Sequence, residues 1–293
     1  MADLDPRITP ARPDLAARWL EGTVTAERFV DGTPARVIES LAPLRRQPRS
    51  DAGLDTEALY GEQLTVYDED DEGWAWVRLA RDGYVGWMPA HAFLKGEGAR
   101  PTHKVAALRT FLYPGPSIKL PPLGWASLGA RVAVVRETEA NGRRFAVTSD
   151  GRAIVANHLV PVDALESDPV AVAERFLGTP YLWGGRSSLG LDCSGLAQTA
   201  YEACGVALPR DADMQEAAPG EAVDLDPRAW RRGDLMFWPG HVALVRDAET
   251  FLHANAFMMA VGIERIDEGL ARIAAGGAPL RCVKRVTLPG RAD

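Results

Sequence analysis

The sequence has few cysteines, and their number is odd. Only three occur among 293 residues, so they cannot all pair, and they are too sparse for a disulfide-stapled scaffold. An excess of basic residues is also missing, because 40 acidic side chains outnumber 33 basic ones. This balance argues against a protein that coats nucleic acid or binds anionic membranes. We therefore expect no nucleic-acid partner and no membrane partner.

Long apolar runs are missing as well. No stretch approaches the roughly 20 apolar residues that cross a bilayer, and the first residues carry acids where a signal peptide has a basic patch. We therefore expect a cytoplasmic protein. Histidine is scarce, with five in the chain, and His91, His103 and His158 have no paired ligand spacing. We expect no metal site and no cofactor.

The length predicts more than one domain. Residues 1–34 are rich in Pro, Arg and Ala and predict an N-terminal arm with a short helical stretch near residues 15–20. From residue 35 the sequence alternates with period two between Asp/Gly turns, which is typical of antiparallel hairpins in a small barrel. The expected strands cover residues 35–38, 63–67, 74–79 and 84–88.

The alternating pattern is repeated. At an offset of 68 residues Gly61 aligns with Gly129, and the turn Asp82-Gly83 aligns with Asp150-Gly151. We therefore predict two tandem copies of one small β fold, in domains 35–98 and 99–164. Both copies resemble bacterial SH3 modules. The first does so through Gly83-Tyr84-Val85-Gly86-Trp87, whereas the second has lost these aromatic residues and is expected to serve structure.

Residues 165–293 change to a mixture of helical and strand patterns and predict an α+β domain. A helix is predicted over residues 170–177, because Asp168 offers a capping side chain and Pro169 stands at the first helical position. Gly178 ends this helix.

Cys193 is predicted to lie at the first turn of a second helix, which runs to Cys204. Free N–H groups and the positive end of the helix dipole lower the pKa of a thiol and can also stabilise an oxyanion. Cys204 lies 11 residues further along the helix, a separation of about 16 Å that excludes a disulfide. Cys204 and Cys282 are predicted to be core residues.

Two histidines follow at the edges of predicted strands. His241 begins one strand, and His253 lies in the next. A cysteine nucleophile needs a base and a group that orients the base. The spacing therefore predicts Cys193 as the nucleophile, His241 as the general base and His253 as the orienting partner. Asn255 shares a strand face with His253 and is an alternative for the third role.

Five ordered motifs resemble the NlpC/P60 family of cysteine peptidases. They are Gly178-Thr179-Pro180-Tyr181-Leu182-Trp183-Gly184-Gly185, Asp192-Cys193-Ser194-Gly195, Arg232-Gly233-Asp234-Leu235, Gly240-His241-Val242 and Phe251-Leu252-His253-Ala254. The resemblance implies a papain-like α+β catalytic domain preceded by two small SH3-like β-barrels. It implies cleavage of peptidoglycan peptides between D-glutamate and the diamino acid. Carried over, Cys193, His241 and His253 are the triad, and Tyr181 lies beside the oxyanion site.

Two SH3-like copies ahead of this domain make the chain similar to the γ-D-glutamyl-L-diamino acid dipeptidyl peptidases. In that group the first SH3 module closes one end of the cleft, so only a substrate with a free N-terminal L-alanine fits. An ammonium group needs oxygen acceptors and favours an aromatic face. We expect the first module to contribute Glu62 and Tyr84, with Glu57 as the alternative acid. The residues that match the amine pocket by position are Trp183, Asp192 and Ser194.

The resemblance thus predicts a cytoplasmic thiol protease that recycles murein peptides of the form L-Ala-γ-D-Glu-diamino acid. We expect no obligate protein partner. A broader endopeptidase on intact peptidoglycan is one alternative, and it predicts an export signal and an open cleft. A non-catalytic wall-binding SH3 protein is the other. It predicts a broken triad, whereas Cys193, His241 and His253 are all present.

Overall fold

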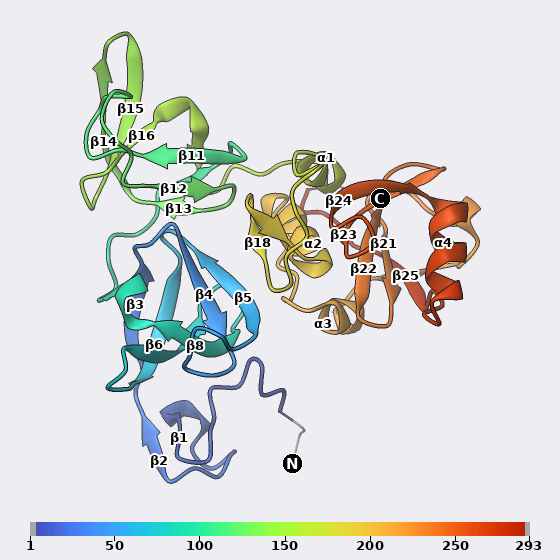
Figure 1. Cartoon of the computed structure of the whole chain (residues 1–293), viewed down its shortest axis with the longest axis horizontal. Helices are drawn as coiled ribbons and strands as arrows, with labels where there is room; N and C mark the ends of the chain where they lie inside the picture. Colours follow the sequence, from blue (N-terminus) through green and yellow to red (C-terminus); the bar gives the residue numbers. More distant parts are fainter. Residues whose placement is uncertain (1–3, 291–293) are drawn as a thin grey trace. The chain divides into compact units, whose positions relative to one another are not determined.

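A computed structural model describes residues 4–290 of the chain. The first three residues of the predicted arm and the last three of the predicted peptidase domain lie outside the described residues. The chain divides into two compact units, Met1–Ala164 and Leu165–Asp293, and each is described by itself. The first is built of strands, and all α-helices of the described residues lie in the second (Figure 1). The predicted α+β class is confirmed.

Within its described residues, the N-terminal arm contains two short strands and a 3-10 turn. Its elements are β1 (Leu15–Ala17), the 3-10 turn η1 (Arg18–Leu20) and β2 (Arg28–Val30). β1 pairs in parallel with β2, and Leu15 is buried against Trp76 of the first module. The short helical stretch predicted near residues 15–20 is therefore found only as the 3-10 turn of residues 18–20. Residues 15–17 form a strand, because this packing overrides the local preference.

The first module is a seven-stranded antiparallel sheet in the order β5-β4-β8-β7-β6-β3-β9. Its elements are β3 (Thr33–Val37), β4 (Leu41–Arg45), β5 (Leu54–Leu59), β6 (Gln63–Glu69), β7 (Trp74–Leu79), β8 (Val85–Pro89), the 3-10 turn η2 (Ala90–Ala92) and β9 (Phe93–Lys95). The four predicted strands correspond to β3, β6, β7 and β8. The sequence did not predict β4, which contains Pro43, because proline is disfavoured inside strands.

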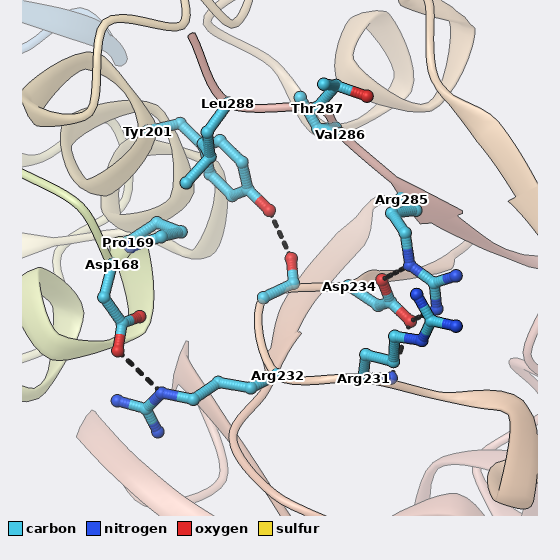
Figure 2. A pocket seen from close by; sticks show the side chains of 11 residues that line it. Asp168, Pro169, Tyr201, Arg231, Arg232, Asp234, Arg285, Val286, Thr287 and Leu288 are labelled. Carbon is cyan, nitrogen blue, oxygen red and sulfur yellow. Dashed lines mark hydrogen bonds and ion pairs between the residues drawn. The ribbon is translucent and has the colours of Figure 1, made fainter. Parts of the chain in front are cut away.

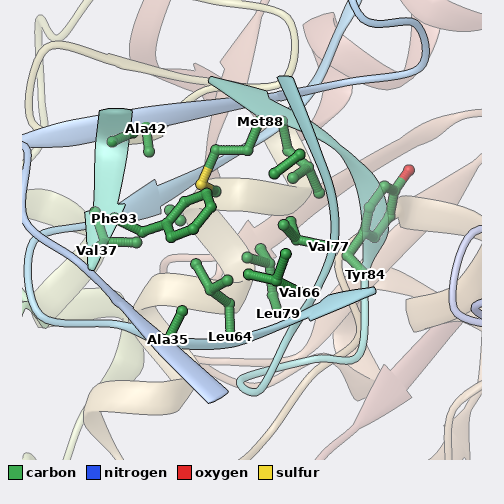
Figure 3. Close-up of a cluster of buried hydrophobic side chains, with 14 residues drawn as sticks. Ala35, Val37, Ala42, Leu64, Val66, Val77, Leu79, Tyr84, Met88 and Phe93 are labelled. Atoms are coloured by element: carbon green, nitrogen blue, oxygen red, sulfur yellow. The ribbon is translucent and has the colours of Figure 1, made fainter. Parts of the chain in front are cut away.

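One apolar core holds this module together. Figure 3 shows Val66, Val77, Leu79 and Met88 directed toward one another from strands β6, β7 and β8. Alternate residues of each strand point to the same face, so the period-two pattern of the sequence becomes this core. Tyr84 lies at the edge of the cluster, with its hydroxyl directed away from the apolar side chains (Figure 3).

A second β module covers residues 103–161 and repeats the pairing order of the first. Its elements are β10 (His103–Val105), β11 (Arg109–Leu112), β12 (Gly124–Ser127), β13 (Arg131–Val132), β14 (Val134–Ala140), β15 (Arg143–Thr148), β16 (Ala153–Val155), the 3-10 turn η3 (Ala156–His158) and β17 (Leu159–Pro161). β10 pairs with β13 and β17 as β3 pairs with β6 and β9. β15 pairs with β14 and β16 as β7 pairs with β6 and β8. That this module is also an SH3 barrel stays a prediction.

The two β modules share part of their core. Leu59, the last residue of β5, and Tyr60, which follows it in the turn, are buried among Val132 and other apolar residues of the second module. The Tyr60 hydroxyl donates a hydrogen bond to Asp150 at 2.5 Å. Gly61 follows with a φ of +82°, and a Cβ there would lie 1.9 Å from a backbone oxygen of the second module. Only glycine fits this approach.

The second unit contains a six-stranded antiparallel sheet in the order β20-β25-β21-β22-β23-β24. Its elements are α1 (Pro169–Glu174), β18 (Arg186–Ser187), β19 (Gly190–Leu191), α2 (Cys193–Ala203), α3 (Ala212–Ala217), β20 (Glu221–Val223), the 3-10 turn η4 (Pro227–Ala229), β21 (Leu235–Trp238), β22 (His241–Val245), β23 (Thr250–Asn255), β24 (Ala260–Arg265), α4 (Ile266–Ala275) and β25 (Cys282–Arg285). α2 packs on β22 and β23, while α4 packs on β24 and covers Phe251 (Figure 1). No helix within residues 4–290 is long and apolar enough to cross a bilayer.

The start of α1 depends on a capping aspartate. Asp168 Oδ1 accepts hydrogen bonds from the backbone N–H groups of Val170 and Ala171, at 2.9 and 3.2 Å. We expect Asp168→Ala to lower the free energy of unfolding by about 1–2 kcal/mol, because it leaves these N–H groups without their acceptor. Calorimetry of the full chain measures this change.

The matched control for this prediction is Asp267→Ala. Asp267 is exposed and accepts a single backbone hydrogen bond, from Glu268. Its replacement should change the free energy of unfolding by less than about 0.5 kcal/mol. Equal effects of the two substitutions would contradict the capping role of Asp168.

Candidate active site

Cys193 begins α2 in a tightly packed turn. Asp192 precedes it and caps the helix, because its Oδ1 accepts a hydrogen bond from the Gly195 N–H at 2.7 Å. A Cβ at Gly195 would lie 2.4 Å from the carbonyl oxygen of Gly185, so only glycine lets the preceding loop cross the helix start. The sulfur of Cys193 reaches the backbone N–H of Val242. This contact places the thiol beside β22, at the residue that follows His241.

Burial dominates the electrostatics of this thiol. Desolvation, followed by the nearby Asp192 carboxylate, raises the pKa of Cys193 to about 12. The backbone N–H groups of Val242 and Ser194 lower this pKa, but by less. Because burial outweighs the Ser194 N–H at the helix start, the expectation of a net lowered pKa is wrong for the free protein. A thiol that stays protonated needs a base to take its proton during attack.

His241 and His253 face each other on the same sheet. Nε2 of His241 lies 2.8 Å from Nδ1 of His253, and the ring planes meet at 63°. Burial, followed by His253, lowers the pKa of His241 to about 3. Burial also lowers the pKa of His253. Both rings are therefore neutral at neutral pH, and each can act as a proton acceptor at the nitrogen that carries no proton.

Tyr181 lies close to the thiol. Burial, followed by the charge of Cys193, raises the pKa of Tyr181 to about 12, so its hydroxyl remains a hydrogen-bond donor. The backbone of Tyr181 is fixed, because its N–H donates to the carbonyl oxygen of Met259 at 3.0 Å. Trp183, two residues later, is 67% exposed and presents its ring at the surface.

Asp192 is held by a buried arginine. The guanidinium of Arg210, a residue only 1% exposed, donates to both Asp192 oxygens at 2.9 and 2.7 Å. The Gly184 N–H donates to the same carboxylate at 2.9 Å. Ser194 Oγ also accepts a hydrogen bond from Arg210, at 2.9 Å. The carboxylate therefore joins the loop, the helix start and Arg210.

Two family profiles match this chain. The NlpC/P60 family matches residues 178–273, and the bacterial dipeptidyl-peptidase Sh3 domain matches residues 44–93. Over 252 residues the chain is 30% identical to dipeptidyl-peptidase 6 of Lysinibacillus sphaericus, which covers 80% of this chain and 92% of that relative. The chain belongs to the NlpC/P60 family.

Further comparisons agree. Proteins named γ-D-glutamyl-L-lysine dipeptidyl-peptidase from Bacillus cereus and Bacillus subtilis are 30% and 32% identical over 210 and 205 residues. These matches cover 63% and 64% of this chain, and 60% and 65% of the relatives. The fold is similar to the crystal structure of an NlpC/P60 family protein from Bacillus cereus, with a TM-score of 0.74 and 24% identity over 88% of this chain and all of that one. The present chain is thus a cysteine-type peptidase of the NlpC/P60 family, with an SH3 domain ahead of its catalytic domain.

The residues predicted in the first module lie inside its fold. Glu62 is 8% exposed, and its carboxylate accepts a hydrogen bond from the Leu59 N–H at 3.1 Å. Glu57 is also buried, on β5, and Tyr84 lies at the edge of the core. Both acids are thus held by the barrel instead of standing on an exposed hairpin.

A separate cavity of about 280 Å³ in the NlpC/P60 domain contains no member of the triad. It lies between α1, α2 and the turn before β21 (Figure 2). Two ion pairs lie in its lining, since Arg232 pairs with Asp168 at 2.8 Å and Arg285 pairs with Asp234 at 2.7 Å. Figure 2 also shows the Tyr201 hydroxyl directed at the Gly233 carbonyl. These contacts tie the helices to the sheet.

The structure adds residues that the sequence analysis missed. Glu264 lies behind His253 with its Oε2 3.2 Å from Nε2 of that ring, and Arg210 holds the helix start. No sequence signal marks either residue, because a lone charged side chain is more often solvated. Asn255, the alternative third member, instead accepts a hydrogen bond from the Met258 N–H at 2.7 Å within its hairpin.

Proposed function

We propose that this protein hydrolyses the bond between γ-D-glutamate and the diamino acid in murein peptides that carry a free N-terminal L-alanine. The observation that carries the proposal is the match of residues 44–93 to the bacterial dipeptidyl-peptidase Sh3 domain. This module precedes a catalytic domain in which His241 and His253 are paired at 2.8 Å and the Cys193 sulfur contacts the N–H of Val242, the residue after His241. Three relatives with dipeptidyl-peptidase names, two of them for a γ-D-glutamyl-L-lysine substrate, support it.

The geometry supports a covalent mechanism. The Cys193 sulfur attacks the γ-glutamyl carbonyl carbon while its proton passes to Nδ1 of His241. Backbone N–H groups at the start of α2, together with the Tyr181 hydroxyl, donate to the oxyanion. The C–N bond then breaks, and His241 returns the proton to the departing amine. Water, deprotonated by His241, attacks the thioester and releases L-Ala-D-Glu and the free thiol.

Recognition of the substrate ammonium is the second part of the proposal. Trp183 offers an exposed aromatic face, and the Ser194 hydroxyl offers an oxygen. Because Arg210 already neutralises Asp192, a second carboxylate is required, and we propose Glu62, with Glu57 as the alternative. We propose that the Tyr84 hydroxyl provides a further oxygen acceptor for the ammonium group.

A pair of substrates tests the proposal. L-Ala-γ-D-Glu-meso-diaminopimelate and its N-acetylated form are incubated with the full chain, and released dipeptide is measured by mass spectrometry. We expect kcat/KM to be at least roughly 100-fold higher for the free amine, because acetylation removes the positive charge and two of the three N–H donors that the acceptors of the amine site would bind. The lysine-containing peptide, run in parallel, measures the preference for the diamino acid.

The same assay separates the alternatives. Equal cleavage of both peptides would overturn the amine requirement and favour a broader wall endopeptidase. Cleavage of neither would favour a wall-binding SH3 protein. Against that last reading, Arg12 of the arm lies over the Trp76 and Trp87 rings at 4.5 and 4.9 Å, so this aromatic face of the first module is already covered. Glu62→Gln and Glu57→Gln, compared on the free-amine peptide, identify the acid by its rise in KM.

The site of action is also part of the proposal. Cys193, Cys204 and Cys282 are all free thiols, and free thiols persist in the reducing cytoplasm. We propose that the enzyme acts there on released murein peptides. Cell fractionation followed by immunodetection tests this location, and recovery outside the cell would contradict it.

A further inference from the structure

A charged pair lies behind the second histidine of the triad. Glu264 is the fifth residue of β24, and its Oε2 lies 3.2 Å from Nε2 of His253. Both carboxylate oxygens of Glu264 also accept hydrogen bonds from Arg272 of α4, each at 2.7 Å. The contacts therefore run in one line from His241 through His253 and Glu264 to Arg272.

The strand register and one glycine allow this arrangement. Gly262 stands directly opposite His253 in the β23–β24 pair, so Glu264 is the diagonal neighbour of His253 on the same sheet face. Gly269 lies where α4 crosses this face, and a Cβ there would come within 2.4 Å of Phe251 and 3.1 Å of the Glu264 carboxyl carbon. Without a side chain at residue 269, α4 comes close enough for Arg272 to reach Glu264.

We propose that Glu264 is a positioning residue that fixes the tautomers of both site histidines. A carboxylate only accepts hydrogen bonds, so the ring nitrogen beside it carries the proton of neutral His253. Nδ1 of His253 is then an acceptor, and Nε2 of His241, 2.8 Å away, must be the donor. Nδ1 of His241 is left without a proton, which is the form that can take the proton of the Cys193 thiol.

The charges around Glu264 keep it in the required form. The contact with His253, followed by the hydrogen bonds from Arg272, lowers the pKa of Glu264 to about 2, so Glu264 is an anion wherever the enzyme works. The contact with His253 lies outside ideal hydrogen-bond geometry. Its influence on the ring is therefore electrostatic to a large extent, and Arg272 holds the carboxylate in place.

Nitrogen-15 NMR of the histidine side chains tests the tautomers directly in the full wild-type chain. We expect His253 and His241 both to carry their proton on Nε2. A proton on Nδ1 of His241 in the free enzyme would overturn the proposal. This measurement uses no substrate and no variant, so it stands apart from the peptide specificity proposed above.

Glu264→Gln then tests the consequence. We expect Arg272 to hold the amide oxygen of the glutamine, so that the amide N–H₂ group donates to Nε2 of His253. The proton of each histidine then moves from Nε2 to Nδ1. We expect His241 to change to the Nδ1–H tautomer and kcat to fall roughly 100-fold or more with little change in KM. Alkylation of Cys193 by iodoacetamide, with Cys193→Ala as the background, should slow in parallel and reports the same effect without a peptide substrate.

Two further variants separate positioning from a purely structural role. Glu268→Gln, an exposed acid of α4, is the matched control and should leave kcat and both tautomers unchanged. Glu264→Asp keeps the charge and should restore the wild-type tautomers and part of the lost kcat. If Glu264→Gln lowers Tm while the tautomers and kcat stay at wild-type values, Glu264 only tethers α4 and the proposal is wrong.

Discussion

Cys193→Ala is expected to lower kcat by roughly four to six orders of magnitude while the chain remains folded. Every step of the proposed mechanism passes through the Cys193 sulfur, and no other thiol lies near the two histidines among the described residues, since Cys204 is at the far end of α2 and Cys282 is on β25. The alanine side chain fits the buried position, so the turn at the start of α2 should persist. Steady-state kinetics and circular dichroism measure the two parts of this result.

The control for this prediction is Cys282→Ala. Cys282 is only partly buried and contacts Glu216, so its loss should leave kcat within about twofold of the wild type. More than about one per cent of wild-type activity in Cys193→Ala would contradict the role of this residue as nucleophile. Loss of activity in both variants would point to unfolding.

Arg210→Met is expected to destabilise the second unit by about 3–5 kcal/mol, because it leaves the Asp192 carboxylate buried without its cation. Arg210 also bonds Ser194, so the substitution loosens the turn that positions Cys193. We therefore expect activity to fall even at temperatures where the chain is folded. Differential scanning calorimetry measures the loss of stability, and kinetics well below the transition measure the loss of activity.

An exposed pair in the same unit provides the comparison. Arg232 pairs with Asp168 at 2.8 Å, and both side chains are about one-third exposed, so Arg232→Met should cost about 1 kcal/mol or less. The double variant Arg210→Met/Asp192→Asn should recover part of the lost stability, since it removes the unpaired charge. Equal destabilisation by the two arginine substitutions would refute the buried ion pair as the cause.

Patterns with a local physical origin were predictable from the sequence. Period-two alternation predicted four strands of the first module, and the capping residue Asp168 predicted the start of α1, because these features depend on neighbouring residues alone. α1 nevertheless ends at Glu174, before the predicted limit of residue 177. Motif order placed Cys193 and the two histidines together, which the 2.8 Å contact between the rings bears out for His241 and His253.

Features that depend on tertiary burial were not predictable. The pKa of Cys193 is set by how deeply α2 lies in the unit, where nine consecutive residues from the start of the helix are buried. Arg210 and Glu264 approach the site from segments far away in sequence, and single charged residues carry no periodic signal. The burial of Glu62 and Glu57 in the first module was not predicted either, because single charged residues carry no periodic signal.

The position of Leu59 and Tyr60 affects how the chain is made. They are packed among residues as distant in sequence as Ile154, so the first module leaves the ribosome with an apolar edge uncovered until the second has been synthesised. During that interval the nascent chain is open to aggregation or to chaperones. A gene fusion that carried residues 35–98 alone would keep this edge exposed permanently. We therefore expect the two modules to be inherited together, and a fusion protein should include both.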